Sequence, residues 1–122
     1  WDTGHANCMP KSQFENIVDL GDKLLALHIA DNLGYTDDHF APFFGTLNMD
    51  EIMSALIKID YKGSFTIEAD NLLISSQWPN RRKIFEGRKD LYMPPVELKV
   101  QAENLLYSIG EHILKTYDVF EG

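Results

Sequence analysis

Apolar residues along this chain follow two periods, and the change from one to the other marks its elements. Residues 24–29 (Leu-Leu-Ala-Leu-His-Ile) form a short, nearly continuous apolar run, which is typical of a strand buried on both faces. Residues 64–69 (Ser-Phe-Thr-Ile-Glu-Ala) alternate polar and apolar positions, as a second strand would. In each segment the next-to-last residue is ionisable: His28 in the first and Glu68 in the second. We therefore expect two strands that carry these side chains near their ends.

The alternation of side chains also predicts which residues share a face of the sheet. One face would carry the ionisable residues and mostly small ones: Leu24, Ala26 and His28, with Ser64, Thr66 and Glu68. The other face would be apolar and covered by helices: Leu25, Leu27 and Ile29, with Phe65, Ile67 and Ala69. A barrel interior with catalytic groups at its C-terminal rim has this distribution.

Helical periodicity occupies the segments around the two strands. After Pro10 and Ser12, one face carries Phe14, Ile17 and Val18, and this helix should close near Gly21. Asn48 should cap a second helix, with Glu51 placed for the return half of a capping box. Its apolar stripe comprises Ile52, Ala55, Leu56 and Ile59.

A third helix should begin at Pro95 and continue to about Tyr117. Its apolar face comprises Leu98, Ala102, Leu105, Leu106, Ile109 and Ile113. The run Arg81, Arg82 and Lys83 lies in a weakly patterned stretch and reads as a solvated loop more readily than as a phosphate contact. Strands alternating with helices predict a parallel α/β sheet.

Composition narrows the class of protein. Of 122 residues 44% are hydrophobic, enough to bury the core of one domain. The net charge of -8 argues against a nucleic-acid partner, because such binding draws on clustered Lys and Arg. A single cysteine excludes an internal disulfide, and no apolar run approaches the roughly 20 residues that span a bilayer. A cytoplasmic location is the default expectation.

Three ionisable residues lie at or near successive predicted strand ends, about one strand–helix unit apart. They are Asp2, His28 and Glu68. Carboxylate and imidazole groups form a ligand set suited to Mn²⁺, Mg²⁺, Co²⁺ or Zn²⁺. Asp2 belongs to an opening segment, residues 1–8, that reads as an active-site signature although no Met stands at position 1. We therefore expect the chain to be the C-terminal piece of a larger enzyme.

Four motifs resemble the sugar isomerase and epimerase group with the xylose-isomerase-like TIM barrel. They are Trp-Asp-Thr-Gly-His-Ala-Asn at residues 1–7, Leu-His-Ile-Ala-Asp-Asn at 27–32, Asp-Asp-His at 37–39 and Phe-Thr-Ile-Glu at 65–68. The resemblance implies an α/β fold in which residues 1–122 are the C-terminal portion, about three βα units, of a single TIM (β/α)8 barrel domain. Its parallel strands would be surrounded by outer helices.

The same resemblance implies roles for the site residues. Asp2, His28 and Glu68 would bind one divalent metal, together with a Glu of the fifth strand that the sequence does not include. Glu68 would also be a catalytic acid/base group, and His5 and His39 would contact substrate. The implied activity is isomerisation or epimerisation of a sugar or sugar phosphate, by proton transfer next to a carbonyl through an enediolate.

Two other interpretations stay open. Asp37 and His39 match an Asp-x-His pair that carries extra zinc ligands in the related AP-endonuclease branch, so a zinc-dependent hydrolase is the alternative enzyme. A partial barrel could instead be inactive as written, and its exposed sheet edge would need a partner chain, such as a second copy. The family often has Pro-Gly-x-Gly where this chain has Pro-Phe-Phe-Gly at residues 42–45, which leaves the substrate open.

Overall fold

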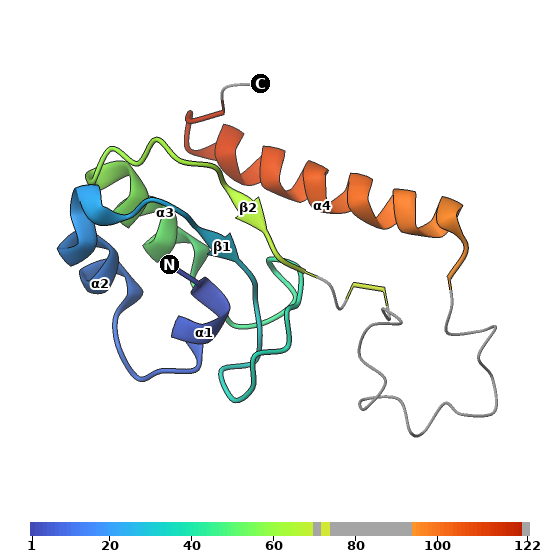
Figure 1. Cartoon of the computed structure of the whole chain (residues 1–122), viewed down its shortest axis with the longest axis horizontal. Coiled ribbons are helices and arrows are strands. Elements are labelled where there is room, and N and C mark those ends of the chain that lie inside the picture. The colour runs from blue at the N-terminus through green and yellow to red at the C-terminus, as the bar shows by residue number, and fades with distance from the viewer. Residues whose placement is uncertain (70–71, 74–93, 121–122) are drawn as a thin grey trace.

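The computed structural model describes residues 1–69, 72–73 and 94–120 (Figure 1). Two short strands, β1 (His28–Ile29) and β2 (Thr66–Ile67), form its sheet. The α-helices are α1 (Thr3–Asn7), α2 (Gln13–Leu20), α3 (Met49–Lys58) and α4 (Val96–Thr116), and a 3-10 turn, Gly21–Lys23, follows α2. The expected basic run of Arg81, Arg82 and Lys83 lies outside the described residues.

The two strands are adjacent and parallel, as the sequence predicted. His28 pairs with Thr66 and Ile29 with Ile67, and the amide of Glu68 donates to the carbonyl of Ile29. Asp2 forms an isolated parallel bridge to His28 on the other side of β1. The sheet thus orders the three segments as residues 1–2, β1 and β2, and it brings Asp2, His28 and Glu68 to neighbouring positions.

Both strands are shorter than predicted, and part of the predicted face pattern is wrong. Leu25 was expected with Leu27 and Ile29 on the covered face, yet its side chain is 83% exposed, whereas Leu24 is buried. The 3-10 turn ends at Leu24, and residues 24–27 stay outside the strand, so strand alternation does not apply there. From Ala26 onward the alternation holds, with Leu27 and Ile29 buried and His28 exposed.

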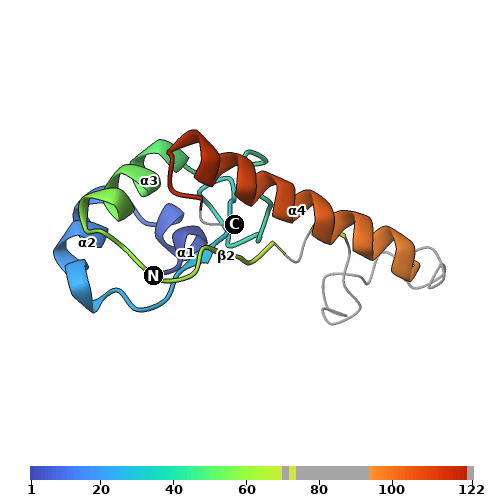
Figure 2. The ribbon, with the colours of Figure 1, turned by 90° about the horizontal axis from the view of Figure 1, so that it is seen from above.

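Helices α2 and α3 pack side by side on one face of the sheet (Figures 1 and 2). Ser12 caps α2 by accepting from the amide of Glu15, and Asn48 caps α3 by accepting from the amide of Glu51. The predicted return half of the capping box is not formed. Instead the Glu51 carboxylate reaches the first turn of α2, where Ser12 Oγ (2.7 Å) and the Phe14 amide (2.9 Å) donate to it. The Glu51 side chain of α3 is therefore hydrogen-bonded to the N-terminal end of α2.

The core lies between these helices and the apolar face of β1. Its buried side chains are Ile17, Leu24, Leu27, Ile29, Met49, Ile52, Met53, Ala55, Leu56 and Ile113. The C-terminal half of α4 joins it through Ile113, and Ile109 packs against it. The N-terminal half projects past the other elements in both views, and Val96, Leu98 and Leu105 are exposed there (Figures 1 and 2). The predicted apolar stripe of α4 is therefore covered only at one end by the described residues.

Candidate metal and active site

Asp2, His28 and Glu68 form a compact group of possible metal ligands. His28 Nδ1 lies 2.8 Å from Glu68 Oε2 and 3.9 Å from Asp2 Oδ2. One donor atom from each of the three residues lies within 4.8 Å of the other two. The parallel register explains this proximity. His28 pairs with Thr66, and Glu68, two residues later, points to the same face of the sheet as Thr66. The expectation that His28 and Glu68 share a face is confirmed.

The first turn of α1 holds Asp2 beside β1. Asp2 is the N-cap of α1, and its Oδ1 accepts from the His5 amide at 3.0 Å. The next residue, Thr3, is fully buried, and its hydroxyl both donates to the carbonyl of Ala30 (2.9 Å) and accepts from the Ala30 amide (3.0 Å). This pair of bonds fixes α1 against the end of β1. Asp2 therefore stands at a fixed place relative to His28.

The group is open to solvent on one side. The side chains of His28 and Glu68 are 52% and 40% exposed, and that of Asp2 is 19% exposed. Such a site can exchange ions and admit a polar small molecule without opening the core. Its two carboxylates give it an excess of negative charge, which favours a cation.

A second group lies next to the first and comprises His5, Asp37 and His39. Asp37 Oδ2 lies 2.9 Å from His5 Nε2 and 2.8 Å from His39 Nε2. His5 also joins the two groups, because its Nδ1 lies 3.3 Å from Asp2 Oδ2. His5 and His39 were predicted to contact substrate, and the structure places them beside the first group but tests no such contact. Asp37 had been noticed in the sequence only through the zinc-site motif.

The second group also has the chemistry of a cation site. Within the part of the chain that the structure describes, Asp37 Oδ1 is buried and has no hydrogen-bond partner. Gly4 allows this close approach, since a Cβ at that position would lie 2.7 Å from Asp37 Oδ1 and 3.1 Å from the Ala30 Cβ. A buried carboxylate oxygen without a donor is costly, and a bound cation would satisfy it. Both groups thus fit a divalent metal by donor type.

Cys8 does not add a nucleophile to the site. Burial, and then the negative charges of Asp37 and Asp38, raise the pKa of its thiol. The thiolate is the reactive form, so a raised pKa keeps Cys8 protonated and unreactive at neutral pH. His112, on α4, is likewise apart from both groups, and its ring contacts that of Phe43 edge-on at 6.4 Å between centroids.

Sequence reasoning missed the buried polar residues that support the site. Asn32 is fully buried, and its Nδ2 donates to the carbonyl of Gly4 at 2.8 Å. Its Oδ1 accepts from Asn7 Nδ2 (2.9 Å) and from the Gly34 amide (2.8 Å). Asn32 therefore links α1 to the loop after β1. Two polar residues directly after an apolar strand, Asp31 and Asn32, were the signal that could have indicated this role.

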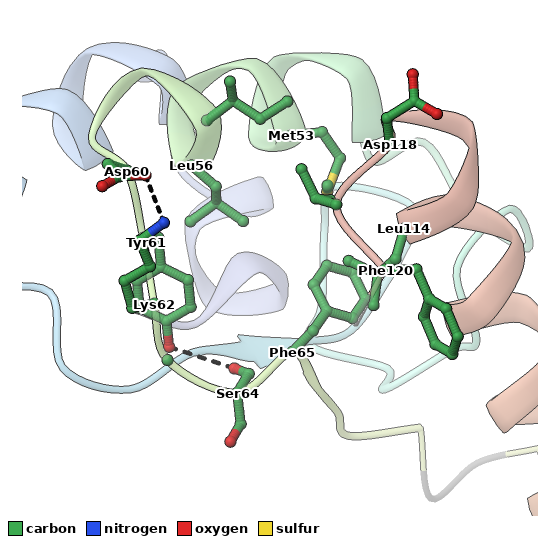
Figure 3. Close-up of a pocket in the computed structure, with 13 residues that line it drawn as sticks. Met53, Leu56, Asp60, Tyr61, Lys62, Ser64, Phe65, Leu114, Asp118 and Phe120 are labelled. Atoms are coloured by element: carbon green, nitrogen blue, oxygen red, sulfur yellow. Dashed lines mark hydrogen bonds and ion pairs between the residues drawn. The ribbon is translucent and has the colours of Figure 1, made fainter. Parts of the chain in front are cut away.

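A cavity of about 560 Å³ lies away from both groups (Figure 3). It opens between the ends of α3 and α4 and the segment that leads into β2, with Met53, Leu56, Phe65, Leu114 and Phe120 among its walls. Tyr61 crosses this region and donates to the carbonyl of Ser64 at 3.2 Å. Burial raises the pKa of the Tyr61 hydroxyl. The lining residues nearest the sheet, Ser64 and Phe65, precede β2, whereas Glu68 follows it, and no residue of either group lines the cavity.

None of the described helices is both long and apolar enough to cross a membrane.

Comparisons with known proteins agree with the geometry. The family described as "Xylose isomerase-like TIM barrel" matches residues 1–89. Over 65 residues the chain is 38% identical to fructoselysine 3-epimerase of Escherichia coli O157:H7, a match that covers 50% of this chain and 24% of that protein.

Two further relatives are known only as proteins of uncharacterised function. The protein y4fM of Sinorhizobium fredii is 35% identical over 68 residues, which cover 56% of this chain and 22% of y4fM. The protein MJ1311 of Methanocaldococcus jannaschii is 34% identical over 74 residues, which cover 59% of this chain and 25% of MJ1311. The chain thus spans about a quarter of the length of the curated relatives it matches. No solved structure gives a significant match.

Proposed function

Because the chain belongs to the family of xylose isomerase-like TIM barrels, we propose that it carries the C-terminal part of the active site of a divalent-metal-dependent sugar or sugar-phosphate isomerase or epimerase. In this proposal residues 1–122 provide about three of the eight βα units of one barrel. The remaining units, and a fourth metal ligand from the fifth strand, lie outside the chain. The match to fructoselysine 3-epimerase covers only 24% of that protein, which supports a chain that forms part of a longer barrel.

One observation carries the proposal: Asp2, His28 and Glu68 come together at neighbouring positions of a parallel sheet. Active sites of TIM-barrel enzymes are built at the C-terminal ends of the strands. Glu68 directly follows β2, His28 lies in the two-residue strand β1, and Asp2 bridges to His28. Helices separate the three residues in sequence. A relative that is 38% identical over half of the chain is named as an epimerase of a sugar derivative, which supports this substrate class.

The donor set suits a divalent metal, and Asp2, His28 and Glu68 would hold it. When bound, such an ion orients neighbouring substrate oxygens and stabilises negative charge that develops on them. Mn²⁺, Mg²⁺, Co²⁺ and Zn²⁺ all accept carboxylate and imidazole ligands. His5 would contact the substrate, because its side chain is 67% exposed between the two groups. One of its ring nitrogens would then exchange Asp2 or Asp37 for a substrate oxygen. His39, on the other side of Asp37, would be the second substrate contact.

Glu68 is the proposed acid/base residue. Its carboxylate would take the proton from the carbon next to the substrate carbonyl, which leaves an enediolate. Return of a proton to the opposite face of that carbon gives the epimer, and return to the neighbouring carbon gives the isomer. No oxidant or further reactant is needed, because the products have the composition of the substrate. The exposed Glu68 side chain can reach a bound polyol without rearrangement of the sheet.

Solvent isotope exchange tests the reaction class. The complete enzyme that carries this chain would be incubated in D₂O with Mn²⁺ and a panel of ketoses and ketose phosphates. We expect deuterium to enter the substrate at the carbon next to the carbonyl. The 122-residue chain alone should show no incorporation, because it lacks the fourth ligand. Absence of incorporation with every ketose in the complete enzyme would contradict the proposal.

The second group favours one alternative, a zinc-dependent endonuclease acting at abasic sites. His5, Asp37 and His39 provide the additional ligand atoms that a multi-zinc hydrolase requires. The net charge of -8 opposes this alternative, because binding of duplex DNA depends on basic side chains. Cleavage of an abasic duplex, without deuterium incorporation into any ketose, would favour the endonuclease over the sugar enzyme.

A further inference from the structure

Asp31 lies near the start of the loop between β1 and α3, residues 30–48, which carries Asp37 and His39. All of the polar atoms of Asp31 form hydrogen bonds within this loop. The residue is 1% exposed and follows β1 by two positions. Its Oδ1 accepts from the amides of Asn32 (2.8 Å) and Leu47 (2.9 Å), and its Oδ2 accepts from the amide of Gly45 (2.9 Å). The carboxylate therefore joins the first residue of the loop to two of its last ones.

The main chain of Asp31 holds the middle of the same loop. Its amide donates to the carbonyl of Phe40 at 2.9 Å, and its carbonyl accepts from the Phe40 amide at 2.8 Å. Together these form an isolated antiparallel bridge. The loop closes tightly over Asp31, because a Cβ at Gly45 would collide with Asp31 Oδ1 and with the carbonyl of Asn32. One buried residue thus fixes the loop at three places.

Phe40 directly follows His39, whose backbone has a φ of 51°. A left-handed conformation at a residue other than glycine is uncommon and persists only where the surroundings hold it. The bridge between Asp31 and Phe40 is the restraint next to His39. His39 Nε2 lies 2.8 Å from Asp37 Oδ2, which in turn contacts His5. The restraint at Phe40 therefore also affects the position of Asp37 relative to His5.

We propose that Asp31 is the positioning residue for Asp37 and His39: its main chain holds Phe40, next to His39, and its carboxylate holds the two ends of the same loop. This deepens the proposed function and rests on it, since His5 and His39 are assigned there as substrate contacts. The second group contacts Asp2 of the first group through His5. The position of the loop that carries Asp37 and His39 therefore affects the geometry next to Asp2. Figure 1 shows the loop between β1 and α3 lying beside α1.

The carboxylate is the chemically specific part of this arrangement. An ionised Asp has only acceptors, and here three amides donate to it. In Asp31→Asn one oxygen becomes an NH₂ group of the same size. That group must face either the Gly45 amide or the amides of Asn32 and Leu47, so a donor meets a donor. The variant should therefore release at least one end of the loop without leaving a cavity.

Imidazole NMR tests the proposal without any measurement of turnover. The sequence contains four histidines, which report on three places: His5 and His39 on the second group, His28 on the first, and His112 on α4. In Asp31→Asn we expect the ring nitrogen shifts of His5 and His39 to move, and those of His28 to stay as in wild type. The amide signal of either Gly45 or Leu47, whichever faces the new NH₂ group, should lose its hydrogen-bonded shift and exchange faster with solvent.

A stability control separates positioning from general destabilisation. Leu56→Ala removes buried volume from the core between α2 and α3, away from the loop. It should lower the melting temperature and leave the His5 and His39 shifts unchanged. If a folded Asp31→Asn variant keeps wild-type shifts for His5 and His39, the proposal is overturned. Equal movement of the His28 shifts would overturn it as well, because the effect would then be general.

A second variant covers the case in which Asp31→Asn does not fold. Gly45→Ala keeps Asp31 as an aspartate but pushes against its carboxylate with the new Cβ, so it disturbs the same contacts from the other partner. It should move the His5 and His39 shifts, and unchanged shifts in this variant would again overturn the proposal. Failure of deuterium incorporation in the complete enzyme would remove the proposed function but leave these shifts as they are. The two failures are therefore distinguishable.

Discussion

Glu68 and His28 come into contact although 39 residues lie between them in the chain. If Glu68 is the acid/base group, Glu68→Gln in the complete enzyme should lower kcat by about 10²–10⁴-fold, because a Gln cannot accept a proton at neutral pH. KM should change much less, since Gln keeps the size of Glu and one oxygen for the metal. Steady-state kinetics and deuterium incorporation would measure both effects.

A matched substitution controls for the change of charge. Glu111 lies on α4, where it pairs with Lys115 at 2.8 Å, away from the site. Glu111→Gln should leave kcat as in wild type. Equal kcat values for wild type and Glu68→Gln would remove Glu68 from the chemistry.

Gly4 is a residue at which a methyl group should damage the site more than the fold. In Gly4→Ala the new Cβ would lie 2.7 Å from Asp37 Oδ1, so the Asp37 side chain must shift from the position in which its Oδ2 meets His5. We expect a loss of stability of about 1–3 kcal/mol, as for other insertions into packed regions. The His5 and His39 imidazole shifts should move as well.

Gly110→Ala provides the comparison for Gly4→Ala. This glycine is inside α4, and a Cβ there meets only the flexible end of the Ile67 side chain, at 3.1 Å. It should leave the imidazole shifts of the second group in place. Wild-type shifts in Gly4→Ala would show that Asp37 does not depend on the missing Cβ.

At the scale of single residues, the sequence allowed the first group to be predicted but not its supports. His28 and Glu68 could be identified because strand phase and residue type are visible in the chain, and Asp2 because it belongs to the opening motif at residues 1–7. The roles of Thr3, Asp31 and Asn32 could not be predicted, because each depends on backbone atoms far away in sequence. Nothing in the pattern of residues states which amide a buried carboxylate will meet.

Between elements, the Glu51 carboxylate makes the association of α2 and α3 dependent on pH. The hydrogen bond from the Phe14 amide, followed by that from Ser12, lowers the pKa of Glu51 despite its partial burial. A group with a depressed folded pKa stabilises the fold above its unfolded pKa, which is about 4.3 for Glu. That contribution is lost as the pH falls through the lower, folded value.

Unfolding experiments with Glu51→Gln test this link. At neutral pH the variant should be less stable than wild type by about 1 kcal/mol, as for loss of a helix cap. The difference should disappear below the folded pKa of Glu51, where wild type is also uncharged. A difference that stays constant from neutral pH down to pH about 2, well below the ordinary glutamate value, would contradict this account.

The elements themselves were predicted unequally. The N-cap of α3 and the extent of α4 follow the sequence closely, because capping residues and helical periodicity are local signals. The strands were predicted too long, because ladder pairing needs a partner along the whole segment, and residues 24–27 lie outside the β1–β2 ladder. Glu51 was predicted to complete the capping box of its own helix, but its carboxylate accepts from the first turn of α2. Only tertiary packing decides between these two partners.

For the whole molecule, parallel pairing and the α/β class could be predicted from the order of apolar segments, and the family match agrees with both. The closed barrel stays a prediction, since the described residues show two strands and the bridge at Asp2. The exposed apolar residues on the N-terminal half of α4 fit a helix that packs against further units.

The central claim is that Asp2, His28 and Glu68 act together as a divalent-metal site, and calorimetric titration with Mn²⁺ tests it most directly. The 122-residue chain should bind the ion weakly, because three ligands leave a position to water and an open sheet holds them loosely. His28→Ala should weaken this binding by at least about tenfold. His112→Ala, which removes an imidazole from α4, should bind as wild type does. Equal Mn²⁺ affinity in wild type and His28→Ala would contradict the account.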